Sequence, residues 1–289
     1  MNFLRNYVFN VKNSLSQPTE KSFVSERKLG QNIPRIIHQI YTELPLPVEF
    51  QDNVEYLKNN NPNWTHRLYD DEAMLSYVER EFSEIYPYFI RIDPAYGACR
   101  ADLFRYLLIY NEGGAYFDIK SGAHKPLDEV IEDGDKYLLS HWPKSEATNG
   151  RYGGIVNPNG ELQQFHIIAV KGHPFLKAVI DTVCNNINRY NPLIHGSGGA
   201  VMVLSGPVTY TNVIYPLMSH YPSRLNYHEE LGYHEDMGIY YSCLEGFVAH
   251  RNVYSRKHYS ELKIPVVKQS NFITVLYKIT YWVKKTILS

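Results

Sequence analysis

Four charged side chains stand at spacings that would bring them together in a folded chain. Asp102 and Arg105 are three residues apart in an apolar stretch, the spacing that makes two side chains neighbours on a helix. Asp118 and Lys120 are two residues apart in a second apolar run, which puts both on one face of a strand. Carboxylate oxygens suit hard divalent cations, whereas an ammonium group supplies hydrogen-bond donors and positive charge. The four residues therefore indicate a site for a polar or charged ligand.

Two predicted elements and the turn between them must position these charges. Residues 99–112 are apolar nearly all round, which predicts a buried helix whose charged side chains are paired. Gly113 and Gly114 end that helix, because glycine accepts the backbone conformation that helix ends adopt. Residues 115–120 form a short apolar run that predicts a buried strand. A carboxylate at the carboxyl end of a central strand lies where open α/β sheets bind ligands.

The order of these residues resembles the nucleotide-sugar site of glycosyltransferase family 32, which includes initiating mannosyltransferases and capsule-synthesis transferases. In that family a helix with Ala/Ser-Asp-x-x-Arg-Tyr leads through Gly-Gly-x-Tyr into an Asp-x-Asp motif. The matching residues here are Ala101, Asp102, Arg105, Tyr106, Gly113, Gly114, Tyr116 and Asp118. The second Asp of the motif is absent, and Lys120 stands in its place. The resemblance covers about residues 33–259 and implies an α/β protein with an A-type glycosyltransferase fold.

The resemblance also implies an activity, which is retaining transfer of a hexose from a UDP- or GDP-sugar to a glycan or lipid-linked glycan acceptor. Asp118, Lys120, Asp102 and Arg105 would be the catalytic set. In the family, Mn²⁺ or Mg²⁺ is held partly by the Asp-x-Asp carboxylates and stabilises the leaving diphosphate.

Lys120 leaves three interpretations open, because an ammonium cannot ligate a metal ion. In the first, a metal is held by Asp118 with late residues and diphosphate oxygens. In the second, Lys120 contacts the diphosphate and replaces part of the metal's charge. In the third, Lys120 only pairs with Asp118 or Asp102, and the site is degenerate.

The resemblance assigns further residues to the two sides of the site. The predicted donor-binding residues are His38, Gln39, Ile40, Tyr41, Asp70, Arg100, Gly114 and Tyr116. The predicted late loop at the diphosphate contains His250, Lys257 and His258, with His250 as a metal ligand beside Asp118. The predicted acceptor side contains Trp142, Ser205 and Gly206. From the residues alone, His38 and Gln39 are equally a strand-end polar pair. Asp70 or Asp71 is expected first to cap the next helix, with a contact to the base and ribose as the alternative.

Composition narrows the class of protein. The chain has 289 residues, 44% of them hydrophobic, and a formal net charge of -1, which does not fit a nucleic-acid binder with its basic footprint. Its three cysteines are scattered without paired spacing, so we expect a reducing compartment, the cytoplasm. We expect no membrane span, because no uninterrupted apolar run reaches about 18 residues.

The chain is predicted to divide into an N-terminal lead-in (1–30), a glycosyltransferase domain (31–262) and a basic, aromatic, amphipathic tail (263–289). The tail would either cover the core or make a peripheral contact with an anionic membrane. Expected strands cover residues 33–41, 64–71, 136–142 and 165–170, and expected helices cover 72–90 and 174–190.

Two other functions fit the same residues. A sugar-nucleotide hydrolase would use water in place of the acceptor. A degenerate transferase would serve as a sugar-nucleotide- or glycan-binding subunit.

Overall fold

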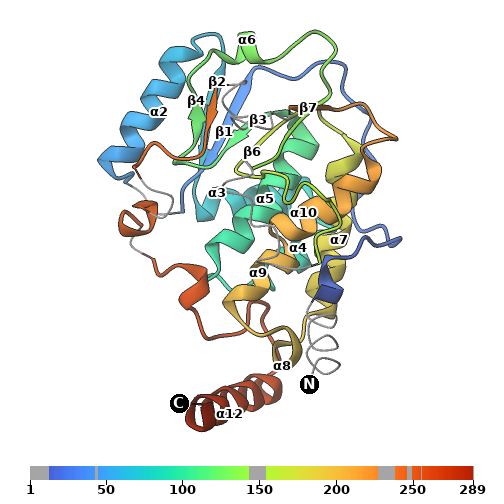
Figure 1. Ribbon diagram of the computed structural model, residues 1–289, viewed down its shortest axis with the longest axis vertical. Coiled ribbons are helices and arrows are strands. Elements are labelled where there is room, and N and C mark those ends of the chain that lie inside the picture. The colour runs from blue at the N-terminus through green and yellow to red at the C-terminus, as the bar shows by residue number, and fades with distance from the viewer. Residues whose placement is uncertain are drawn as a thin grey trace.

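A six-stranded mixed sheet forms the centre of the protein (Figure 1). The structure is a computed structural model, and it describes residues 13–42, 45–142, 154–226, 238–245, 249–254 and 256–288. The strand order is β2-β1-β3-β6-β5-β7, and β6 runs antiparallel to β3 and β5 while the other pairs are parallel. The bounds are β1 Ile36–Ile40, β2 Thr65–Tyr69, β3 Gly114–Phe117, β5 Tyr137–Ser140, β6 His166–Ala169 and β7 Arg224–Asn226. A separate pair joins β4 (Gly122–Ala123) to β8 (Ile239–Tyr240) antiparallel.

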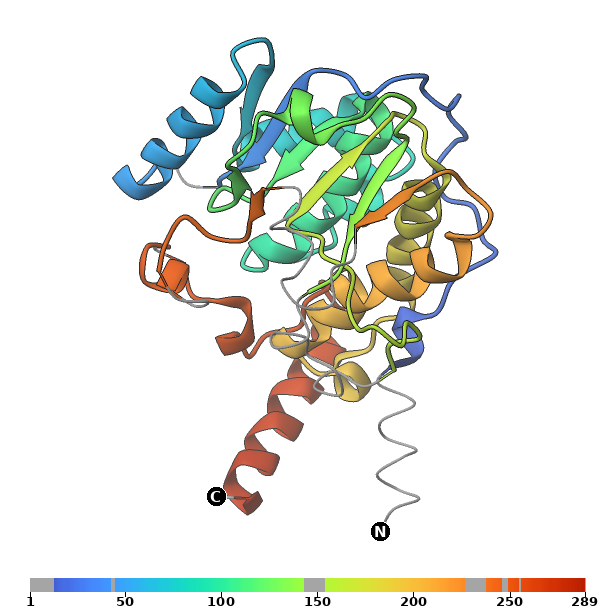
Figure 2. The same ribbon diagram turned by 45° about the horizontal axis from the view of Figure 1, so that its top comes forward.

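Helices cover both faces of this sheet (Figures 1 and 2). The larger core lies against α3, α4, α5, α7, α9 and α10, and the smaller core against α2 and α6. The helix bounds are α2 Val48–Asn60, α3 Asp71–Glu81, α4 Tyr86–Phe89, α5 Gly97–Glu112, α6 Leu127–Val130, α7 Pro174–Arg189, α8 Pro192–His195, α9 Val201–Leu204, α10 Pro207–Ile214 and α12 Asn271–Leu288. Short 3-10 turns are η1 Asn13–Ser16, η2 Gly198–Ala200, η3 Tyr215–Leu217, η4 Ala249–Asn252 and η5 Tyr259–Glu261. The predicted α/β class is confirmed.

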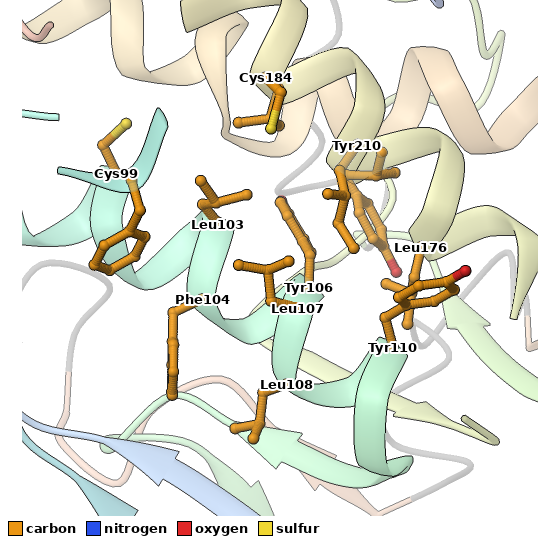
Figure 3. Close-up of a cluster of buried hydrophobic side chains, with 14 of the residues drawn as sticks. Cys99, Leu103, Phe104, Tyr106, Leu107, Leu108, Tyr110, Leu176, Cys184 and Tyr210 are labelled. Carbon is orange, nitrogen blue, oxygen red and sulfur yellow. The ribbon is translucent and has the colours of Figure 1, made fainter. Parts of the chain in front are cut away.

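Helix α5 is the buried helix that the sequence predicts. Figure 3 shows its side chains pointing to two sides, with Phe104 and Leu108 toward the sheet and Leu103 toward Cys184 of α7. All of these side chains are fully buried. Since burial of large apolar side chains is the main stabilising contribution to a fold, α5 is the centre of the larger core.

The glycine turn after α5 behaves as predicted. Gly113 ends the helix with a positive φ of 74°, and Gly114 follows at 101°. A Cβ atom added at Gly114 would lie 2.5 Å from the carbonyl oxygen of Ile36, so only glycine lets β3 pair with β1 here. Gly114 therefore supports the sheet and does not line the site.

Two predicted elements are wrong in extent. The strand predicted to Lys120 ends at Phe117, because the next residues turn and the Ser121 amide donates to the Asp118 carbonyl at 2.8 Å. The helix predicted over 72–90 is broken between α3 and α4, where the buried side chains of Phe82 and Ile85 turn the chain toward the core. The remaining predicted strands and the helix ending near residue 190 are confirmed, shorter by a few residues.

Candidate active site

A cleft of about 440 Å³ opens at the carboxyl ends of β1 and β3, where α/β sheets place their ligand sites. Its lining comes from distant parts of the chain: the residues after β1, the first half of α5, the turn after β3, the start of α9 and α10, and the late segment 251–259. Predicted site residues that line it are Ile40, Tyr41, Asp102, Arg105, Tyr116, Asp118, Lys120, Trp142, Gly206, Lys257 and His258.

Asp118 is the centre of the charged cluster in this cleft. Lys120 Nζ lies 2.8 Å from its Oδ2, and Arg105 Nη1 lies 2.8 Å from its Oδ1. The Tyr116 hydroxyl donates to the same Oδ1 at 2.8 Å. The turn after β3 keeps Asp118 and Lys120 close even though the predicted strand ends earlier. The sequence predicts only that Asp118 and Lys120 share one face of a strand, and their ion pair belongs to one of the three interpretations left open for Lys120.

Asp102 joins the cluster from α5. Arg105 Nη2 lies 3.1 Å from Asp102 Oδ1, which makes the helical pair that the spacing predicts. The Ser205 hydroxyl donates to Asp102 Oδ2 at 2.9 Å. Ser205, predicted on the acceptor side, therefore positions Asp102 through this hydrogen bond and does not itself line the cleft.

Burial and pairing set the protonation of the two carboxyls differently. Burial would raise the pKa of Asp118, but the charges of Lys120 and Arg105 outweigh it and hold that pKa well below its usual range. Burial raises the pKa of Asp102 to about 6, against the opposing effects of Arg105 and Ser205. Asp118 is therefore a firm anion, whereas Asp102 titrates close to neutral pH.

The two cations of the cluster also contact aromatic rings. The Arg105 guanidinium carbon lies 4.7 Å from the Tyr116 ring centroid, and Lys120 Nζ lies 4.5 Å from that of Tyr241. Burial would lower the pKa of Lys120, but the Asp118 charge raises it above its ordinary value. Lys120 is thus a permanent positive charge on the wall of the cleft.

The late segment adds a rim of positive charge. Arg251, Arg256 and Lys257 are exposed and line the cleft, and Arg256 Nη1 lies 2.9 Å from Asp71 Oδ2. His258 is neutral at pH 7, because burial and the nearby Arg251 charge lower its pKa to about 4. A basic rim over a buried anion–cation cluster favours a ligand with both hydroxyl and phosphate groups.

Tyr41, the residue predicted to stack on the nucleotide base, lines the cleft and has a protein partner for its ring. Its ring stacks on Tyr254 of the late segment, with centroids 5.8 Å apart and planes at 28°. It also meets Phe50 edge-on at 5.7 Å. The late segment therefore closes against the end of β1 through aromatic contacts.

Four other predicted donor-side residues do not line the cleft. His38 is buried and contacts the Tyr69 hydroxyl (3.2 Å) and the Gly113 carbonyl (3.1 Å), so it ties β1 to the end of α5. Gln39 lies between His66 and the Asp118 carbonyl. Asp70 caps α3 by accepting from the Ala73 amide at 2.8 Å, and Arg100 stacks over Phe89. These contacts give all four a structural role.

Several residues that line the cleft were not among the site residues predicted from the sequence. Gln164 donates to Asp102 Oδ1 at 3.4 Å and lies beside Glu161 just before β6. Arg251, Arg256 and Tyr254 belong to the late segment. Their only sequence signal is the density of basic and aromatic residues around 250–259, which does not say which part of the fold they meet.

The chemistry of these donors does not fit a divalent cation. Both oxygens of Asp118 accept hydrogen bonds from Lys120, Arg105 and Tyr116, and a metal ion there would lie against an ammonium. Within the residues that the structure describes, no group of three His, Cys, Asp or Glu side chains could hold a metal ion. The side chain of His250 lies outside the described part, so its predicted role stays a prediction.

Comparison with known proteins finds a family match within the first half of the chain and similarity to two mannosyltransferases. Residues 47–137 match the family described as glycosyltransferase sugar-binding region containing DXD motif. Inositol phosphoceramide mannosyltransferase 1 of Schizosaccharomyces pombe is 26% identical over 66% of this chain and 55% of its own length. The initiation-specific alpha-1,6-mannosyltransferase of Candida albicans is 22% identical over 76% of this chain and 62% of its own. The chain thus spans little more than half of these relatives.

A solved structure is similar in shape at low identity. The UDP-bound glycosyltransferase domain from the YGT toxin aligns with a TM-score of 0.48 and 7% identity, over 68% of this chain and 80% of that chain.

Proposed function

We propose that the protein is a retaining glycosyltransferase that moves a hexose from a UDP- or GDP-sugar to a glycan or lipid-linked glycan acceptor. The observation that carries the proposal is the position of the Asp118–Lys120–Arg105 cluster. It lies at the carboxyl end of β3, in a cleft with an exposed basic rim.

Each part of a nucleotide-sugar has a matching surface in this cleft. The carboxylates of Asp102 and Asp118 would accept hydrogen bonds from sugar hydroxyls, as Asp102 now does from Ser205. Lys120 and Lys257 would meet the diphosphate, and the ring of Tyr41 would lie against the base.

In the proposed reaction, the bond between the anomeric carbon and the phosphate oxygen breaks and its electron pair stays on the diphosphate. The acceptor hydroxyl oxygen bonds to the anomeric carbon from the same face, and its proton passes to a diphosphate oxygen. Negative charge grows on the leaving group, so a fixed cation aimed there lowers the barrier. Lys120 supplies that charge in our proposal, since its ammonium is held by Asp118 on the cleft wall.

The donor set makes Lys120 the preferred source of this charge over Mn²⁺ or Mg²⁺. The carboxylates of Asp102 and Asp118 are already engaged by cationic and hydroxyl donors. Under this proposal, Lys120 contributes in this chain what a metal contributes in an Asp-x-Asp site.

The proposed acceptor class follows from the relatives. One is named an inositol phosphoceramide mannosyltransferase, which acts on a lipid, and another is named for initiating a mannose chain. We propose a lipid-linked or glycan acceptor on the side of the cleft formed by Trp142, Met202 and Gly206.

The test is release of nucleoside diphosphate from a panel of UDP- and GDP-sugars, with Mn²⁺ and with EDTA. Slow hydrolysis of the donor needs no acceptor. We expect one donor to react, the reaction to survive in EDTA, and Lys120→Met to abolish it. The exposed Lys58, away from the cleft, serves as the matched control in Lys58→Met. Loss of wild-type activity in EDTA would contradict the role given to Lys120.

The ion pair between Lys120 and Asp118 also favours one second candidate, a degenerate subunit that binds a sugar-nucleotide without reaction. Calorimetric binding of a donor by a folded protein that releases no diphosphate, with or without a glycan, would identify it. Restored metal-stimulated turnover in Lys120→Asp would support the same conclusion.

A further inference from the structure

The outward face of helix α12 is apolar along its length. Phe272 is 74% exposed and Trp282 is 66% exposed, and Val275 and Ile279 lie between them at more than half exposure. These positions recur at intervals of three and four residues, so they share one face of the helix. An apolar surface of this kind, rimmed by polar residues, marks an interaction site.

The opposite face of α12 holds the helix to the body of the protein. Tyr277 is buried, and together with Thr280 and Tyr281 it faces Leu193 and Ile194 of α8. The segment before the helix is fixed as well. The Lys268 amide donates to the Arg91 carbonyl at 2.8 Å, and the Asp93 amide donates to the Val266 carbonyl at 2.9 Å. The apolar face is therefore presented from an anchored helix.

The charge of this region has one sign. From residue 262 onward the chain contains no Asp or Glu, and its basic residues are Lys263, Lys268, Lys278, Lys284 and Lys285. An apolar stripe with tryptophan and neighbouring lysines has the composition of helices that lie in a membrane interface. Within the described residues, no helix is long and apolar enough to cross a bilayer.

We propose that α12 binds the surface of an anionic lipid bilayer, with Phe272, Val275, Ile279 and Trp282 inserted and the exposed Lys268 and Lys278 at the headgroups. A second copy of the chain fits this face less well. Packing two such helices together would oppose their lysines, and α12 has no carboxylate to pair with them.

The anchoring also orients the cleft. Helix α8 contacts α12, and only the short turn η2 separates it from α9, whose Val201 and Met202 line the cleft. Gly198 of η2 packs so tightly against the Tyr259 carbonyl that a side chain there would clash. Figures 1 and 2 show α12 projecting at this end of the molecule. Resting on the proposed function, we infer that the acceptor is a lipid-linked sugar presented by the same membrane.

The test is co-sedimentation of the full chain with vesicles of phosphatidylcholine alone and of an equimolar phosphatidylcholine–phosphatidylserine mixture. We expect binding to the anionic vesicles, weakened by salt, and a blue shift of tryptophan fluorescence that disappears in Trp282→Phe. The double variant Val275→Ser/Ile279→Ser should bind at least about tenfold more weakly, because it removes apolar area from the inserted face.

A matched control changes the same two residue types elsewhere on the surface. Val48 and Ile90 are exposed on α2 and after α4, so Val48→Ser/Ile90→Ser should bind vesicles as the wild type does. Equal binding by both double variants, or no binding by the wild type, would overturn the proposal. So would a dimer in sedimentation velocity that Val275→Ser/Ile279→Ser converts to a monomer.

Donor hydrolysis in solution separates this proposal from the proposed function. The α12 variant should release nucleoside diphosphate at the wild-type rate, since its changed residues lie outside the cleft. A wild-type protein that binds vesicles but hydrolyses no donor would contradict the transferase proposal and support the membrane-binding proposal. A wild-type protein that hydrolyses a donor but binds no vesicles would contradict the membrane-binding proposal and support the transferase proposal.

Discussion

Helices α5 and α12 are similar in length and apolar content, yet they have opposite places in the molecule. Helix α5 has 16 residues, 11 of them buried, and its charges Asp102 and Arg105 are paired inside the protein. Helix α12 has 18 residues, exposes Phe272 and Trp282, and carries lysines without an acidic residue. Apolar content therefore does not determine where a helix lies. The partners available to its charged residues distinguish the two cases.

The largest effect should come from removing Asp118, the anion directly after β3 that pairs with Arg105 of α5. Asp118→Ala leaves Arg105 and Lys120 buried without their shared carboxylate, which should cost about 3–5 kcal/mol of unfolding free energy. Urea unfolding followed by circular dichroism measures this. A loss below about 1 kcal/mol, the range of exposed pairs, would show that solvent already screens the cluster.

The next largest effect should come from truncating an apolar side chain, which should lower the free energy of unfolding in α5 but not in α12. Leu107→Ala in α5 removes a fully buried side chain and should cost about 2–5 kcal/mol. Ile279→Ala in α12 removes a side chain that is 53% exposed and should change stability by no more than about 0.5 kcal/mol. Equal losses in urea unfolding would mean that the outward face of α12 is covered in solution.

Acid should lower the stability of the fold through its buried and half-buried histidines, of which His38 in β1 has the lowest pKa. Burial lowers the pKa of His38 to about 3, against the opposing hydrogen bond with the Gly113 carbonyl. In the unfolded chain His38 binds a proton near pH 6.5, whereas in the folded chain it stays neutral down to about pH 3. The free energy of unfolding therefore falls as the pH drops from about 6.5 toward 3. Asp102 acts in the opposite direction between about pH 6 and 4, because its folded pKa is raised.

The check is the urea midpoint as a function of pH in three proteins. His38→Gln should flatten the acid-side fall, and Asp102→Asn should steepen it. Identical slopes in all three would show that these two groups titrate normally in the folded protein.

The smallest effect should come from a charge pair outside both helices. Glu55 and Lys58 are 2.8 Å apart on the exposed face of α2. Glu55→Gln should leave the urea midpoint unchanged, because solvent screens exposed pairs. A clear shift would indicate that charge pairs stabilise this protein whether or not they are buried, and the interpretation of Asp118 would weaken with it.

Local signals predicted the α5–β3 unit well. The apolar run, the Gly113–Gly114 turn and the spacing of Asp102 and Arg105 depend on neighbours within twenty residues, and the structure confirms them. The spacing does not predict the ion pair that Arg105 also makes with Asp118. The strand was predicted to extend to Lys120, but the turn closed by the Ser121 amide on the Asp118 carbonyl ends it, and the apolar residue types of this run do not signal that turn.

Residues whose roles depend on distant partners were harder to assign. His38 lies in the middle of β1, and Asp70 directly follows β2. A polar residue at either position suits a ligand contact or a structural hydrogen bond, so the residue type alone does not distinguish them. Only their observed partners, Gly113 and Ala73, separate the two roles. Arg251 and Arg256 lie more than 130 residues from Asp118 in the sequence, and no periodicity places them beside it.

The stacking of Tyr41 on Tyr254 divides the cleft into two walls of different origin. One wall is built on the sheet and α5, within or next to the region 47–137 that matches the sugar-binding family. The other is the late segment 251–259, which contains no strand of the central sheet. Natural variation can therefore exchange the second wall while the first is preserved. Under the proposed function, the choice of donor would therefore depend on the late segment as well as on the region that matches the family.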